Sequence, residues 1–182
     1  AEEAEALIDA MAARVMAAVG ETVYSTEPGA PIEAVVAALL ARVGGTVALY
    51  ETNTSGMIAE RLADARGDDA IPAWTTTSAE MPPFLKELVG AQGGLPSEAA
   101  AIACARAVRY AGGAPYGLAV LGTSGSDEGV FGRDAGVTWI ALAGDGGEQS
   151  VRIPYGGGDE HSAARISNQA LSLLWRHLKT AS

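Results

Sequence analysis

Apolar residues along the 182-residue chain recur at helical spacing in some segments and in short continuous runs in others. Leu7, Met11, Val15 and Ala18 lie three or four positions apart, which predicts an amphipathic helix over residues 3–19 that Gly20 ends. The next segments read as a short strand, a linker and a second helix, at 21–25 ("ETVYS"), 26–31 ("TEPGAP") and 31–43.

From Thr46 onward, apolar runs typical of buried strands alternate with segments of helical periodicity. Strands are expected at 46–50, 70–76, 116–122, 136–144 and 149–155, and helices at 55–65, 81–89, 97–110 and from about 159 through Trp175. Strand and helix alternate early, and two strands follow each other late, which indicates a mixed sheet with helices on both faces. We therefore predict an α/β fold, a three-layer α/β/α sandwich with a mixed, mostly parallel sheet.

The linker divides the chain unequally. We expect residues 1–30 to be the end of an upstream region plus linker, and residues 31–182 to form one domain, since single domains commonly hold about 100 to 200 residues.

Charge and composition reduce the range of functions that the chain can have. The chain has 22 acidic residues against 12 lysines and arginines, a net charge of −10, so we expect neither a nucleic-acid nor a membrane partner. Its acidic N-terminus differs from the basic start of a signal peptide, so we expect a cytoplasmic protein. One cysteine and two distant histidines offer little to build a metal site, and we expect no metal and no cofactor. Cys104 reads as a small buried helix residue, and His177 as a cation suited to a helix C-terminus.

Three loops that follow strands are candidates for chemistry, because helix N-termini with unpaired N–H groups converge at the carboxyl ends of strands in α/β sheets. The first is "ETNTSG" at 51–56. Thr54 or Ser55 can cap the following helix, which leaves Thr52 and Asn53 free to face a ligand. The alternative is that the whole turn is a structural helix cap.

The second candidate is "LGTSGSDEG" at 121–129, in which Gly122, Thr123, Ser124 and Gly125 offer backbone N–H groups and hydroxyls to an anion. It lacks the P-loop lysine, and a plain connecting loop is the alternative.

The third candidate is the start of the last helix. Asp159 can cap it and place Arg165 near its positive end, and a solvated first turn is the alternative. A Ser-His-Asp triad of Ser97 or Ser124, His161 and Asp159 lacks the usual "GxSxG" turn, and Ser97 reads instead as a helix cap.

Taken in order, these segments resemble the C-terminal domain of the CinA (competence/damage-inducible) family, whose members include nicotinamide mononucleotide deamidases. The family's "A-E-S-C-T-G-G" corresponds to "YETNTSG", its "V-S-E" to "PSE" at 96–98, and its "S-G-I-A-G-P" to "LGTSGSD". Its "P-V-G-T-V-W-x-A" resembles "RDAGVTWIAL", its "G-D-R" is echoed by Gly158-Asp159, and the last helix ends in a similar "ALSLLW". Residues 16–40 resemble the join to an upstream molybdopterin-binding-like region.

The resemblance implies hydrolysis of the carboxamide of nicotinamide mononucleotide, with a serine nucleophile that a tyrosine and a lysine assist. At the matching positions this chain has Thr52 for the serine, Thr76 for the tyrosine and Met81 for the lysine, and it retains Glu51 and Thr54. From the loops and the resemblance together, the expected ligand-binding residues are Glu51, Asn53, Thr54, Gly122, Thr123, Ser124, Gly125 and Arg165, although Glu160 stands where the family's "G-D-R" has its arginine. The resemblance further implies a nicotinamide-mononucleotide-like partner and a homodimer.

The replacement at Met81 bears most on activity, because a hydroxyl attacks an amide only when a neighbouring base takes its proton, and a thioether cannot. Lys86 could substitute only after a local rearrangement. Three hypotheses follow. The site is impaired or repurposed for ligand binding, Thr52 acts in a deamidase with a different base, or the domain is a structural or dimerisation module.

Overall fold

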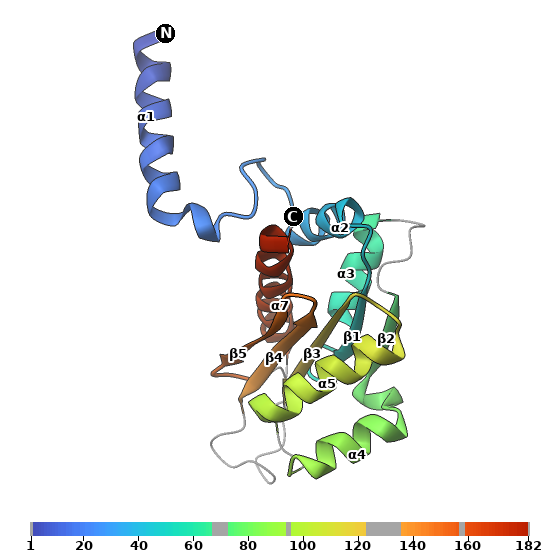
Figure 1. Cartoon of the computed structure of the whole chain (residues 1–182). Coiled ribbons are helices and arrows are strands. Elements are labelled where there is room, and N and C mark those ends of the chain that lie inside the picture. The colour runs from blue at the N-terminus through green and yellow to red at the C-terminus, as the bar shows by residue number, and fades with distance from the viewer. Residues whose placement is uncertain (1, 67–72, 94–95, 123–135, 157–158, 182) are drawn as a thin grey trace.

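The computed structural model describes residues 2–66, 73–93, 96–122, 136–156 and 159–181. In chain order its elements are α1 (Glu2–Val19), η1 (Gly20–Thr22), α2 (Ile32–Arg42), β1 (Val47–Glu51), α3 (Met57–Arg66), β2 (Trp74–Thr77), η2 (Ser78–Glu80), α4 (Pro83–Ala91), α5 (Glu98–Ala111), β3 (Tyr116–Gly122), β4 (Thr138–Gly144), β5 (Gly147–Ile153) and α7 (Glu160–Ala181), as labelled in Figure 1.

The strands form one five-stranded sheet in the order β2-β1-β3-β4-β5. Strand β1 pairs in parallel with β2 and with β3, whereas β4 pairs antiparallel with both β3 and β5. The predicted mixed sheet is confirmed. The expectation of a mostly parallel sheet needs correction, because two of these four pairings are antiparallel: β4 returns beside β3, and a tight hairpin then leads into β5.

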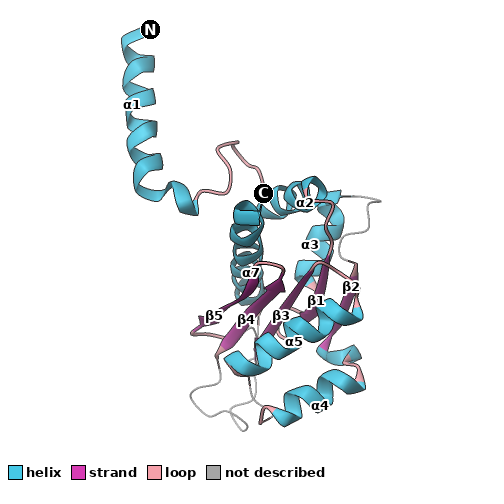
Figure 2. Cartoon of the chain, viewed as in Figure 1, coloured by secondary structure: helices cyan, strands magenta, loops and turns pink. Residues whose placement is uncertain are grey.

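Helices cover both faces of the sheet, which confirms the three-layer α/β/α sandwich (Figure 2). On one face, α2, α3 and α7 enclose a core of large aliphatic side chains such as Leu49, Leu118 and Leu174. On the other face, α4 and α5 pack through smaller residues, among them Ala101, Cys104 and Ala105. Cys104 is fully buried, as expected, and burial raises the pKa of its thiol to about 12.

Helix α1 extends away from these layers (Figure 1). Its apolar side chains are exposed, including Leu7, Ile8, Met11 and Val15. That residues 1–30 belong to an upstream region stays a prediction. Within the described part of the chain, no helix combines the length and the apolar character that crossing a membrane would take.

The expected strand at 21–25 is wrong. Its first two residues end the short helix η1, and Val23–Ser25 are irregular. A strand needs a neighbour for its backbone N–H and C=O groups, and this segment lies outside the sheet, with Tyr24 40% exposed.

The close contact between α5 and β3 depends on Gly117. A Cβ at this position would lie 2.1 Å from the carbonyl oxygen of Ala105 and 2.7 Å from the Cβ of Arg109. Only glycine therefore lets the helix approach the central strand this closely.

His177 is buried beneath the β4–β5 hairpin, not placed as an exposed cation at a helix end, so that expectation is wrong. Its Nδ1 lies 3.3 Å from the amide nitrogen of Gln149, Tyr116 packs edge-on to its ring, and its Nε2 has no hydrogen-bond partner among the described residues. Burial lowers the pKa of this imidazole below its ordinary 6.5, against the opposing charge of Asp145.

Gly117→Ala should destabilise the protein by about 3 kcal/mol, because the new methyl group meets backbone atoms that cannot move aside. Gly90→Ala in α4 is the matched control. Nothing lies within 4 Å of its added Cβ, and an exposed helix gains about 1 kcal/mol from alanine. Denaturant unfolding measures both variants, and equal stabilities would contradict the close packing of α5 on β3.

The pH dependence of stability should report His177. Because its folded-state pKa lies below the unfolded value of 6.5, the unfolded chain binds the proton more tightly, and stability is lost as the pH falls through that region. The free energy of unfolding should decrease between about pH 7 and pH 5.5, and His177→Phe should flatten that part of the curve. An unchanged slope in the variant would show that other groups cause the loss.

Candidate functional site

The strand order creates a topological switch point at the carboxyl ends of β1 and β3. From β1 the chain proceeds to β2 on one side and then crosses to β3 on the other. Ligands of open α/β sheets bind where such a reversal occurs. Thr52, the first residue after β1, lies there and donates its backbone N–H to the carbonyl of Val120 over 3.0 Å.

The hydroxyl of Thr52 extends the pairing between these two strands. It accepts a hydrogen bond from the N–H of Gly122 at 2.8 Å, and its single proton faces the carbonyl oxygens of Gly122 at 3.0 Å and Val120 at 3.1 Å. Asn53 Oδ1 lies farther away, at 3.4 Å. Within the described residues these are the polar partners of the hydroxyl, and none of them is a basic side chain.

Asn53 belongs to a chain of hydrogen bonds that links the turn after β1 to the start of β4 and to the segment after β5. Its amide donates to the hydroxyl of Thr138 over 2.8 Å, and that hydroxyl donates to the carbonyl of Tyr155 over 2.9 Å. Gly122 makes room for this chain, since a Cβ there would lie 2.3 Å from the amide nitrogen of Asn53. The expectation that Thr52 and Asn53 stay free to face a ligand is therefore wrong, because both side chains hold neighbouring strands.

Glu51 caps α3 with its side chain, a role that was predicted for Thr54 or Ser55. The carboxylate is 1% exposed and accepts hydrogen bonds from the N–H groups of Ile58 and Ala59, at 3.1 and 3.0 Å. Thr54 donates its hydroxyl to the same carboxylate over 2.6 Å. Negative charge suits a helix N-terminus. Both residues therefore fix the turn, and their N–H partners are not open to an anion.

Ser55 adopts a left-handed backbone conformation, with a φ of 54°. Such a φ is uncommon for residues other than glycine and costs about 1 to 3 kcal/mol. Strain of this kind is often found at functional sites, and here the side chain is exposed beside the buried Thr54. The family motif that this stretch resembles has glycine at the position of Ser55.

Thr76 and Met81 lie on the other side of β1. Thr76 stands opposite Tyr50 in the parallel pairing and donates its hydroxyl to the carbonyl of Glu80 over 3.0 Å. Met81 is half-buried and packs against the core of the α4–α5 face. Lys86, the alternative base, is exposed on α4.

Arg165 joins the same end of the sheet through Tyr155. Its guanidinium carbon lies 4.9 Å from the centre of that ring, and the carbonyl of Tyr155 accepts from Thr138. Thr138 and Tyr155 were not predicted as site residues, although "GVTW" held a signal for Thr138, a polar residue at the start of an apolar strand. Arg165 is exposed and retains capacity for an anion.

The remaining candidates divide between caps and undescribed positions. Asp159 accepts the N–H of Ser162 at 2.9 Å, and Ser97 accepts the N–H of Ala100 at 3.1 Å, so both expected caps are confirmed. Thr123, Ser124, Gly125 and Gly158 lie outside the described residues. Among the residues described, no three His, Cys, Asp or Glu side chains gather as metal ligands would.

A family model described as the CinA C-terminal domain matches residues 85–178, which is more than half of the chain. The chain belongs to the CinA family. The switch point and the turn at Thr52 are therefore parts of a CinA-type fold.

Relatives and solved structures agree. A CinA-like protein of Anaeromyxobacter sp. (strain Fw109-5) is 34% identical over 175 residues, covering 91% of this chain and 42% of the relative. A CinA-like protein of Geotalea uraniireducens (strain Rf4) is 31% identical, covering 84% and 37%. The chain thus spans less than half the length of these relatives. A CinA superfamily protein from Klebsiella pneumoniae 700603 has the same fold, with a TM-score of 0.70, 21% identity and coverage of 82% of this chain and 96% of that one.

Glu51→Gln should destabilise the domain by about 2 kcal/mol, because the amide NH₂ would face a donor in place of an acceptor oxygen. Glu60→Gln is the control, since Glu60 is exposed in the first turn of the same helix. Thermal and denaturant unfolding measure both variants. Equal stabilities would contradict the capping role of Glu51.

Proposed function

We propose that this CinA domain binds a nicotinamide-mononucleotide-like molecule at the carboxyl ends of β1 and β3, and that its amide-hydrolysing activity is impaired. The proposal rests on family membership and on the resemblance of its motifs to those of the family's deamidases. The proposal concerns this domain alone, because the chain spans less than half the length of the relatives it matches.

The observation that supports impaired hydrolysis best is the environment of the Thr52 hydroxyl. This group hydrogen-bonds to the backbone of β3, and its partners among the described residues include no lysine, histidine or carboxylate. Met81 occupies the position of the family lysine. Loss of a general base typically lowers the rate by about 10² to 10⁴.

The observations that support ligand binding are the position of the turn and the nearby cation. The turn at Thr52 lies at the switch point of the sheet, the usual place for a nucleotide in such folds. Arg165 reaches the same end of the sheet and is exposed, so it can contact a phosphate. A homodimer and a cytoplasmic location stay predictions.

Ammonia release from nicotinamide mononucleotide tests the impaired chemistry. We expect the native protein and Thr52→Ala to release the same background amount of ammonia. Release should increase when Thr52→Ser is combined with Met81→Lys, because the lysine would supply the missing base. Thr75→Ala on the exposed face of β2 is the control for folding. Turnover by the native protein that is lost in Thr52→Ala but kept in Thr75→Ala would instead establish an active deamidase.

Calorimetry and thermal shift with the same nucleotide test the binding. A rise in the melting temperature at millimolar nucleotide, smaller in Arg165→Gln than in the native protein, would support the proposal. No shift at that concentration would overturn it and favour a structural or dimerisation module.

A further inference from the structure

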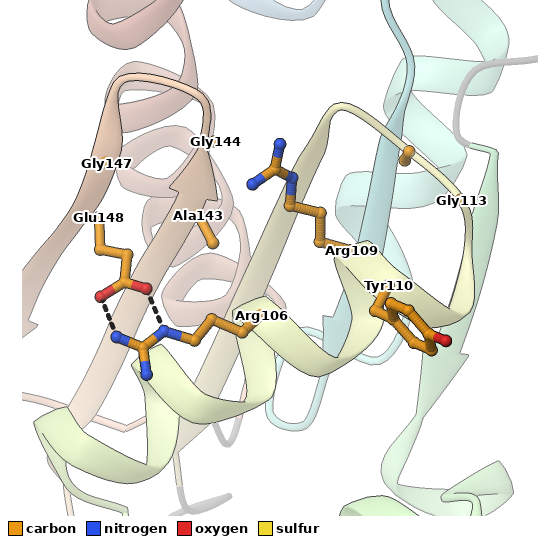
Figure 3. Close-up of a pocket in the computed structure, with 9 residues that line it drawn as sticks. Arg106, Arg109, Tyr110, Gly113, Ala143, Gly144, Gly147 and Glu148 are labelled. Atoms are coloured by element: carbon orange, nitrogen blue, oxygen red, sulfur yellow. Dashed lines mark hydrogen bonds and ion pairs between the residues drawn. The ribbon is translucent and has the colours of Figure 1, made fainter.

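A pocket lies at the end of the sheet opposite Thr52, where β3 begins. The last turns of α5, the loop through Gly113 and Ala114, and the hairpin between β4 and β5 enclose about 610 Å³ (Figure 3). Pockets for small ligands commonly hold about 300 to 1,000 Å³. Thr52 contacts the other end of β3, so this pocket is separate from the candidate site.

Two arginines line the pocket but differ in how firmly they are held. Arg106 makes a bidentate ion pair with Glu148, in which both carboxylate oxygens accept (Figure 3). Arg109 makes one hydrogen bond to Asp145, whose side chain is 86% exposed. An exposed single ion pair contributes little stability, so an incoming anion can replace Asp145 on Arg109.

The packing of α5 positions the side chain of Arg109 in advance. Its Cβ lies where a Cβ of residue 117 would collide with it, so the absence of a side chain at Gly117 lets the stem lie against β3. The guanidinium then projects toward the hairpin that carries Gly144 (Figure 3). A positioned arginine loses less conformational entropy when it binds a ligand.

The rest of the lining consists mainly of small residues. Ala114 and Ala143 are buried alanines in the lining, Gly144 is buried as well, and Gly113 and Gly147 are exposed. Tyr110 is also among the lining residues and is 90% exposed, but its ring points away from the guanidinium of Arg109 in Figure 3.

We propose that this pocket binds a small molecule that carries a carboxylate or phosphate. The anionic group takes the place of Asp145 on Arg109, and the rest of the molecule lies between the loop at Gly113 and the hairpin at Gly147. Glu148 remains on Arg106. This inference does not rest on the proposed function, because it uses none of the residues at the Thr52 end of the sheet.

Titration of the native chain with benzoate and with phenyl phosphate tests the proposal, and amide NMR shifts of Gly113, Gly144 and Gly147 locate the binding. We expect saturable shifts at these glycines. Arg109→Gln should weaken binding at least about tenfold, while Arg152→Gln, an exposed arginine on β5 outside the pocket, should not change it.

Asp145→Asn distinguishes binding in the pocket from nonspecific attraction of anions to a cationic surface. Removing the competing carboxylate should tighten binding about three- to tenfold, and this exposed hairpin residue can be changed without disturbing the core. Absence of saturable shifts, equal weakening by Arg109→Gln and Arg152→Gln, or no tightening in Asp145→Asn would each overturn the proposal. A stronger response to one probe identifies which anionic group the pocket prefers.

Discussion

The buried carboxylate of Glu51 joins the end of β1 to the start of α3, and the geometry of the switch point depends on this cap. Its two oxygens accept from two backbone N–H groups and from the hydroxyl of Thr54. A carboxylate so enclosed is stable only while these donors remain in place, because an unsatisfied buried charge costs several kcal/mol. The turn that carries Thr52 and Asn53 is therefore held from its N-terminal side by the cap and from its far side by β3. This rigidity directs the Thr52 hydroxyl into the strand pairing.

The architecture could be predicted from the sequence because burial imposes a simple pattern. Runs such as 116–122 are apolar at nearly every position since helices cover both faces of their strand, and the helices show their own period. The proline and glycine signals placed most element ends. The segment 21–25 was wrongly predicted as a strand because the pattern along a chain does not show whether a neighbouring strand exists. The antiparallel share of the sheet was underestimated because the sequence shows that two strands follow each other late, but not that β4 also runs antiparallel to β3.

The sequence predicted where the candidate site lies better than it predicted which polar atoms of the site remain free. Residues 51–54 do meet the end of β3, yet which of their polar atoms remain available depended on partners about 70 and 85 residues away, namely Gly122 and Thr138. A local rule assigns the cap to the nearest hydroxyl, whereas the fold assigns it to the longer side chain of Glu51, which reaches the N–H groups of α3 from the preceding strand. His177 shows the same limit: its place in the last helix was evident, but its burial under two glycines of a hairpin was not.

The two edges of the sheet also constrain how this domain meets other copies of itself. Strand β2 has only four residues, and β5, at the opposite edge, carries exposed Glu148, Gln149 and Arg152. Short and charged border strands discourage continuation of the sheet into another molecule, which is a common protection against aggregation. Both edges of the sheet are therefore poor templates for a strand of another molecule.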